Sequence, residues 1–77
     1  MNKVRRNQLE KIVEQLENQI ANLEEVRDEE QDAYDNMPEG IQCSERGDIM
    51  QENIDDIDNA IFELENIIES INDIINR

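Results

Sequence analysis

The sequence predicts an all-α protein: an antiparallel hairpin of two long helices that pairs with a second hairpin into a four-helix bundle. Apolar residues recur at helical spacing in two segments of similar length, and a short break containing a proline and a glycine separates them. A chain of 77 residues is short enough to form one domain, residues 1–77.

The first predicted helix covers about residues 3–35. Its leucines are spaced by seven residues, and when they are assigned to heptad position d, other apolar residues fall at positions a and g. This gives an apolar face about three positions wide, which is typical of a bundle helix. The residues are Leu9, Leu16 and Leu23 at d, Val13, Ile20 and Tyr34 at a, and Ile12, Val26 and Ala33 at g.

The second predicted helix covers about residues 45–76 and has a more regular pattern. Isoleucine is not a strong helix former, so the spacing predicts this helix and the residue type does not. Phe62 and Ile49 lie outside the apolar face. The face consists of Ile54, Ile61, Ile68 and Ile75 at a, Met50, Ile57, Leu64 and Ile71 at d, and Ala60, Ile67 and Ile74 at g.

Residues 36–44 are predicted to form the interhelical loop. Pro38 disfavours helical angles at the residue before it, and Gly40 provides the freedom that a turn requires. Ser44 is a candidate N-cap for the second helix. A second candidate cap at Asp48 would start that helix four residues later.

Two polar residues interrupt the apolar face of the first helix. Folding the chain back about the loop places Arg27, at a, opposite Ile57, and Glu30, at d, opposite Ile54. Arg27 either packs its aliphatic stem on the edge of the bundle, the interpretation we favour, or forms a polar layer that fixes register or partner choice. Gly47 also falls at a, where it would permit close approach of another backbone.

We predict a homodimer, because each helix presents a face wider than one hairpin seam can cover. Isoleucine at both a and d favours bundles of more than two helices. The alternative is a monomer whose third apolar column stays partly exposed. The predicted oligomer interface lies on the second helix and consists of Ile54, Ile57, Ile61, Leu64, Ile67, Ile68, Ile71 and Ile74.

The composition argues against several classes of function. There is no histidine, and the one cysteine, Cys43, has acidic neighbours and no base to activate it. The acidic run from Asp28 loosely resembles a calcium loop, but Ala33 stands where that loop requires glycine. We therefore predict no enzyme, no cofactor and no metal site.

The formal net charge is −14, from 21 acidic and 7 basic residues. This charge repels nucleic acid and anionic membranes, so the expected partner is a basic protein surface, such as that of a nucleic-acid-binding protein. The chain shows no secretory signal and no apolar run of about 18 residues, which predicts a soluble cytoplasmic protein. A single cysteine fits a reducing compartment.

The acids gather in two stretches: residues 24–35 hold seven acids and one base, and residues 48–73 hold nine acids and no base. Acids three or four positions apart on a helix lie about 5–6 Å apart, which is comparable to the separation of DNA phosphates. The alternative is that the charge only provides solubility, although −14 exceeds the magnitude of about 2–8 that solubility requires. The predicted partner-binding residues are Glu24, Glu25, Asp28, Glu29, Asp32, Glu52, Asp55, Asp56 and Phe62.

The run from Asp28 to Gly40, with Ala33-Tyr34-Asp35-Asn36-Met37-Pro38 at its centre, is followed by Ser44-Glu45-Arg46-Gly47. It resembles small uncharacterised phage and prophage proteins of Gram-positive bacteria. The likeness spans most of the chain, and its specific part is the loop and its flanks. The resemblance implies a mobile element in a bacterial host cytoplasm and carries over no functional residues. Small acidic phage proteins include DNA-mimicking inhibitors of nucleases, which this chain is similar to in charge and size.

Overall fold

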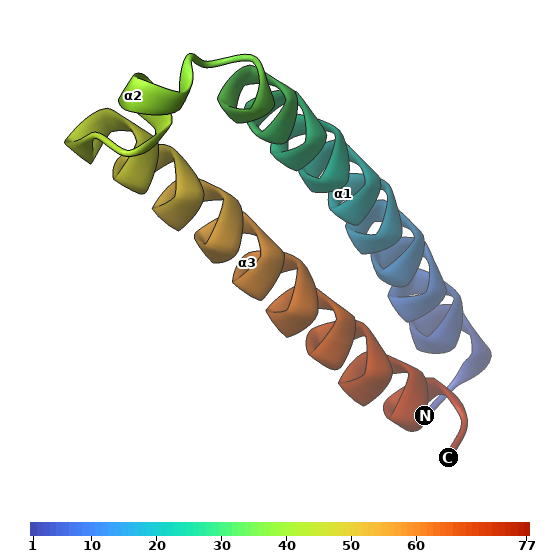
Figure 1. The fold of residues 1–77 in the computed structure, drawn as a ribbon. Helices are drawn as coiled ribbons and strands as arrows, with labels where there is room; N and C mark the ends of the chain where they lie inside the picture. The colour runs from blue at the N-terminus through green and yellow to red at the C-terminus, as the bar shows by residue number, and fades with distance from the viewer.

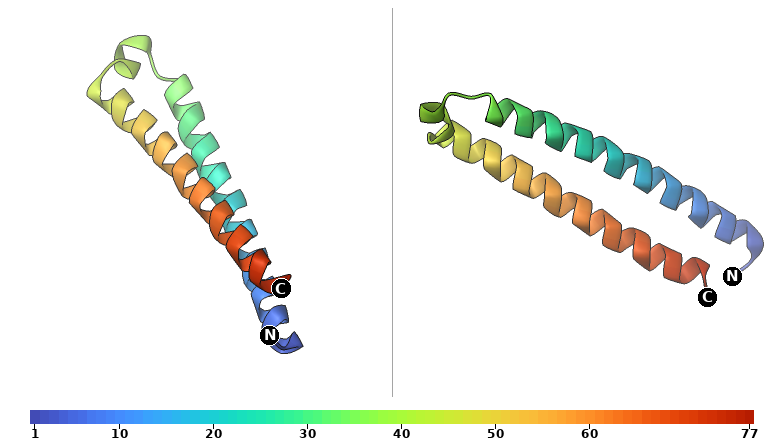
Figure 2. Two further views of the ribbon diagram at one scale, coloured as in Figure 1. Left: turned by 90° about the horizontal axis from the view of Figure 1, so that it is seen from below. Right: turned by 45° about the vertical axis from the view of Figure 1, so that its right-hand side comes forward.

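Two long antiparallel helices dominate the computed structural model, which describes all residues from 1 to 77 (Figure 1). Helix α1 spans Lys3–Asp35, α2 spans Glu39–Gln42 and α3 spans Glu45–Ile75. The α1 and α3 helices lie side by side along their whole length, with both termini at one end and α2 at the other (Figure 2). The predicted all-α hairpin is confirmed, and its second helix ends one residue earlier than predicted.

The N-terminus of α1 is capped by Asn2, whose side chain accepts a hydrogen bond from the backbone N–H of Arg5 at 2.9 Å. This satisfies one of the N–H groups that have no partner within the helix. The helix ends at Asp35, and the backbone N–H of Met37 then bonds to the carbonyl of Tyr34. Pro38 follows, in keeping with the bias of a residue before proline against helical angles.

The loop predicted for residues 36–44 contains a single helical turn, α2, that the sequence did not indicate. One turn is too short to show hydrophobic periodicity, and the nearby Pro38 and Gly40 favour a turn. Gln42, at the end of α2, donates a hydrogen bond from its side-chain amide to the carbonyl oxygen of Tyr34 at 2.8 Å. The connection is thus tied back to the end of α1.

Helix α3 begins after Ser44, as predicted, so the alternative start at Asp48 is wrong. The Ser44 hydroxyl does not cap the helix, because it donates to the carbonyl of Ile41 instead. The predicted close approach at Gly47 is confirmed. Gly47 is buried, and a Cβ there would lie 2.6 Å from the carbonyl carbon and 2.8 Å from the Cα of Gln42.

The core is one narrow seam between α1 and α3. Six of 77 residues are buried, and apart from Gly47 they are all valine or isoleucine at heptad position a. Half-buried residues at the d positions flank them. The buried apolar residues are Val13, Ile20, Ile54, Ile61 and Ile68.

Two side-chain contacts agree with the predicted register. The guanidinium of Arg27 reaches across the seam to the carboxylate of Asp58, the neighbour of the predicted facing residue Ile57. At the open end, Arg6 donates to the carbonyl oxygen of Arg77 at 3.2 Å, which connects the two termini.

Candidate interaction surfaces

The outer sides of both helices form a wall of carboxylates. Because position a faces the seam, positions b, c and f point away from it, and these positions carry most of the acids. Among the eight acids predicted to bind a partner, Glu24 is half-buried. The other seven are exposed: Glu25, Asp28, Glu29, Asp32, Glu52, Asp55 and Asp56.

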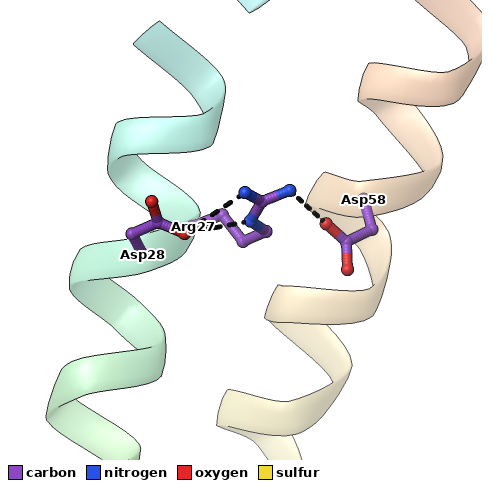
Figure 3. Close-up of polar contacts among 3 residues, drawn as sticks. All are labelled: Arg27, Asp28 and Asp58. Carbon is purple, nitrogen blue, oxygen red and sulfur yellow. Dashed lines mark hydrogen bonds and ion pairs between the residues drawn. The ribbon is translucent and has the colours of Figure 1, made fainter. Parts of the chain in front are cut away.

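Almost all of these carboxylates lack a basic partner within the chain. The two ion pairs in the structure both involve Arg27, which bonds to Asp28 and to Asp58 (Figure 3). Of the 21 acidic side chains, these two are paired, so the other 19 have no intrachain cation within bridging distance. Their charge is therefore not neutralised by ion pairs within the chain.

Arg27 links the two helices on one side of the seam. Its guanidinium lies 2.9 Å from Asp58 on α3 and 3.2 Å from Asp28 on α1, and the Arg27 side chain is 30% exposed. The hydrogen bonds to Asp58 and then to Asp28 raise the pKa of Arg27 above its ordinary value, so its charge is secure. The side chain therefore makes a polar interhelical contact. Asp28, predicted to bind a partner, is already engaged by Arg27.

The seam has an apolar flank and a polar flank. On α1 and α3 alike, the apolar residues at d are half-buried, whereas three of the four larger apolar residues at g are exposed and the fourth, Ile74, is half-buried. The opposite flank, formed by the e columns, carries glutamate, glutamine, aspartate and asparagine besides Lys3. The large exposed residues at g are Ile12 at 43%, Val26 at 51% and Ile67 at 48%.

The predicted oligomer interface divides into two groups in the structure. Ile54, Ile61 and Ile68 are buried in the seam of their own hairpin. The members of the other group keep accessible surface: Ile57, Leu64, Ile67, Ile71 and Ile74. Ile12 and Val26 on α1 extend the apolar flank and were not among the predicted interface residues, although their g positions would have indicated them.

Phe62 lies in a third environment, on the outer side of α3. It is 62% exposed, and neither the loop nor α1 covers it. Acids surround it along the helix, because Asp55 and Glu69 lie one heptad away on either side and Asp58 and Glu65 lie one turn away. The aromatic ring and the carboxylates thus share one exposed surface.

The structure contains no group of three or more Cys, Asp or Glu side chains arranged to hold a metal ion. Its one hollow is a shallow depression lined by Val26, Glu29 and Glu30. Cys43 is a free, exposed thiol. No helix combines the length and the apolar character needed to cross a membrane.

A comparison with protein-family models found no matching family, and comparisons with curated proteins and with solved structures found no match.

Proposed function

We propose that this chain is a non-enzymatic acidic binding protein that occupies the basic, nucleic-acid-binding groove of another protein and blocks it. The observation that carries the proposal is the set of 19 carboxylates without an intrachain cation, displayed on a rod with principal extents of 59 × 15 × 12 Å. The resemblance to phage and prophage proteins suggests that the partner is a host protein in a bacterial cytoplasm.

The geometry of the wall supports a nucleic-acid groove as the target. Exposed acids follow one another at three- and four-residue intervals on α1, from Glu25 through Glu29 and Asp32. Such neighbours lie about 5–6 Å apart, while DNA phosphates rise about 3.4 Å each along one strand and are separated further by the winding. A stiff helix pair can therefore present negative charge at nearly the repeat that a basic groove accommodates.

Phe62 adds an aromatic anchor to the part of the acid wall that lies on α3. Charge alone gives fast, salt-sensitive association, whereas a buried aromatic side chain gives slow dissociation. A partner with arginine or lysine side chains around an apolar pocket would match both features, and a cation can also pack on the ring face.

Competition with DNA tests the proposal. Host proteins captured on the immobilised chain at low salt would be purified, and each would be titrated with the chain and with a short DNA duplex. We expect the chain and the duplex to exclude one another, and the affinity of the chain to fall steeply as salt rises. A purified partner that binds both at once would refute blocking of the groove, as would the absence of any captured basic protein.

A charge-matched pair of variants separates the predicted partner-binding acids of α1 from net charge. The triple variant Glu25→Gln, Glu29→Gln, Asp32→Asn removes three exposed carboxylates from the proposed surface. The control, Glu10→Gln, Glu14→Gln, Glu17→Gln, removes three exposed carboxylates elsewhere on α1. We expect the first variant to bind the partner at least tenfold more weakly than the control. Equal losses would mean that only total charge matters.

A structural role is the second candidate: a module that assembles as a homodimeric four-helix bundle or adaptor. The support for this candidate is the large accessible surface of the single chain. The chain exposes 5767 Å², whereas a compact monomer of 9.1 kDa exposes only about 4,900 Å². Light scattering at high salt tests it, because apolar assembly survives screening and yields twice the mass of the chain.

A further inference from the structure

We propose that the hairpin docks a second copy of itself through one defined face, formed by the d and g columns of α1 and α3 together, here called the d/g face. The inference rests on the proposed homodimer and specifies where the two copies meet. Besides Glu30 at d, the face holds polar residues only at g. Its apolar members include Ile12, Leu16 and Val26 on α1 and Ile57, Leu64 and Ile67 on α3.

The antiparallel arrangement brings these four columns together. In a right-handed helix, d and g lie on one side of a, and e lies on the other. When two antiparallel helices both turn their a columns inward, their g columns lie on the same side of the seam. The contact between Arg27, at a, and Asp58, at e, lies on the opposite side of the seam.

The burial pattern shows which side of the seam is open. All five buried apolar residues belong to the a column, and no apolar residue at d is buried. A hairpin that satisfied its own seam would bury both columns, because a and d together form the contact between two helices. Here the d side chains face partly outwards, and the exposed Ile12 and Ile67 continue the surface beyond them.

Charge distinguishes this face from the rest of the molecule. Of 21 acids, none lies at a g position within α1 or α3, and one, Glu30, lies at d. The g columns instead begin with Arg5 on α1 and Arg46 on α3. Two chains of charge −14 repel one another through every other side, so the d/g face is where a second copy can approach.

The area is sufficient for a stable dimer. A face about 45 Å long and two helices wide, about 20 Å, covers roughly 900 Å² on each copy. Stable protein interfaces bury about 800 Å² per partner. A second copy supplies an apolar, nearly acid-free face of the same length, whereas a basic partner is attracted to the outer carboxylates.

Sedimentation equilibrium of the full chain in high salt, with three variants, tests the face. Ile12→Glu and Ile67→Glu place a carboxylate on the exposed part of the d/g face, and Phe62→Glu makes the same charge change on the outer side of α3. We expect a dimer for the wild type and for Phe62→Glu. For each d/g variant we expect the dissociation constant to rise on the order of a hundredfold or more, because each dimer loses two buried side chains. Circular dichroism should show unchanged helix, since Ile12 and Ile67 are exposed in the hairpin.

The other outcomes have distinct meanings. A wild type that sediments as a single chain up to millimolar concentration overturns the dimer and this inference with it, and leaves the acid-wall proposal standing. A dimer that Phe62→Glu disrupts as strongly as Ile67→Glu overturns the assignment of the face, while the dimer itself remains.

Discussion

The two ends of the hairpin are held by different kinds of contact. Towards the end that carries the termini, the seam is mainly apolar: four buried a residues form one cluster, and leucine and isoleucine at d pack against it. One polar contact, from Arg6 to the carbonyl oxygen of Arg77, lies beyond this cluster. At the loop end, the next a position of α1 is Arg27, and the contacts include an ion pair, a hydrogen bond from Gln42 and the backbone approach at Gly47.

This difference indicates that the strength of association between the two helices and the choice of their register depend on different contacts. Burial of apolar surface is non-directional, and isoleucine recurs every seven residues in α3, so a slip of one heptad would still place apolar residues opposite one another. At the loop end, the Arg27–Asp58 ion pair and the bond from Gln42 to Tyr34 join particular atoms of α1 to the rest of the chain, and a slip would break them. We infer that the terminal end supplies most of the stability and that the loop end supplies most of the specificity.

The largest expected effect compares the same substitution at both ends. Ile61 and Ile54 are each 6% exposed, but only Ile61 belongs to the apolar cluster. Replacing a buried isoleucine with alanine costs about 2–5 kcal/mol in the free energy of unfolding. We expect Ile61→Ala near the upper limit and Ile54→Ala near the lower, measured by urea unfolding at one protein concentration. Equal losses would contradict the division between the two ends.

The next effect tests the loop end through its glycines. Gly47→Ala places a methyl group against the backbone of Gln42, which must move, and such overpacking costs about 1–3 kcal/mol. Gly40→Ala is the control, because a Cβ there meets nothing within 4 Å. We expect it to leave stability unchanged or to raise it by up to about 1 kcal/mol. Thermal unfolding of both variants and the wild type measures the difference in stability. A Gly47→Ala variant as stable as the wild type would show that α2 can shift to make room for the methyl group without a loss of stability.

The sequence predicted the helices well because periodicity accumulates over many residues. Seven-residue spacing sustained from Leu9 to Tyr34 and from Met50 to Ile75 predicted both long helices, and with the loop length it predicted a register that the contact between Arg27 and Asp58 supports. The turn of α2 could not be predicted, since four residues carry no period. Gly47 was recognised as a site of close approach, but its partner, Gln42, depends on how α2 folds back.

The surfaces were predictable to a lesser extent. Heptad positions alone indicated that Glu25 and Asp32 would be exposed. They did not reveal that Asp28 is engaged by Arg27, because that contact depends on where the long Arg27 side chain lies between the helices. The heptad positions also did not distinguish Ile61, which is buried within the hairpin, from Ile67, which remains exposed. Which apolar columns are buried depends on how each helix is rotated about its own axis, and the packing of the two helices against each other sets that rotation.

A smaller effect is expected at the hydrogen bond that ties α2 to α1. Gln42→Ala removes the donor to the Tyr34 carbonyl in a partly buried contact, which should cost about 0.5–1.5 kcal/mol. The control is Gln31→Ala, because Gln31 donates to Asp35 in an exposed contact and its loss should stay within about 0.5 kcal/mol. Hydrogen exchange of the amides at residues 39–44 provides a local readout, and we expect faster exchange only in the Gln42 variant.

The smallest effect is expected at Arg27, where it distinguishes the two interpretations of this residue. Its pKa is raised by Asp58 and Asp28, so the charged form stabilises the fold at neutral pH, and this contribution is lost only as the pH rises through that strongly alkaline value. The pair is partly exposed, and exposed ion pairs contribute little in salt. Arg27→Leu would continue the apolar column of α1 to the loop end, so we expect a slightly higher thermal midpoint in high salt. A lower midpoint together with a broader transition would instead show that the bond to Asp58 holds the helices in register. Leucine can pack equally well against any of the isoleucines that recur every seven residues in α3, so the variant would permit a one-heptad slip that Arg27 prevents.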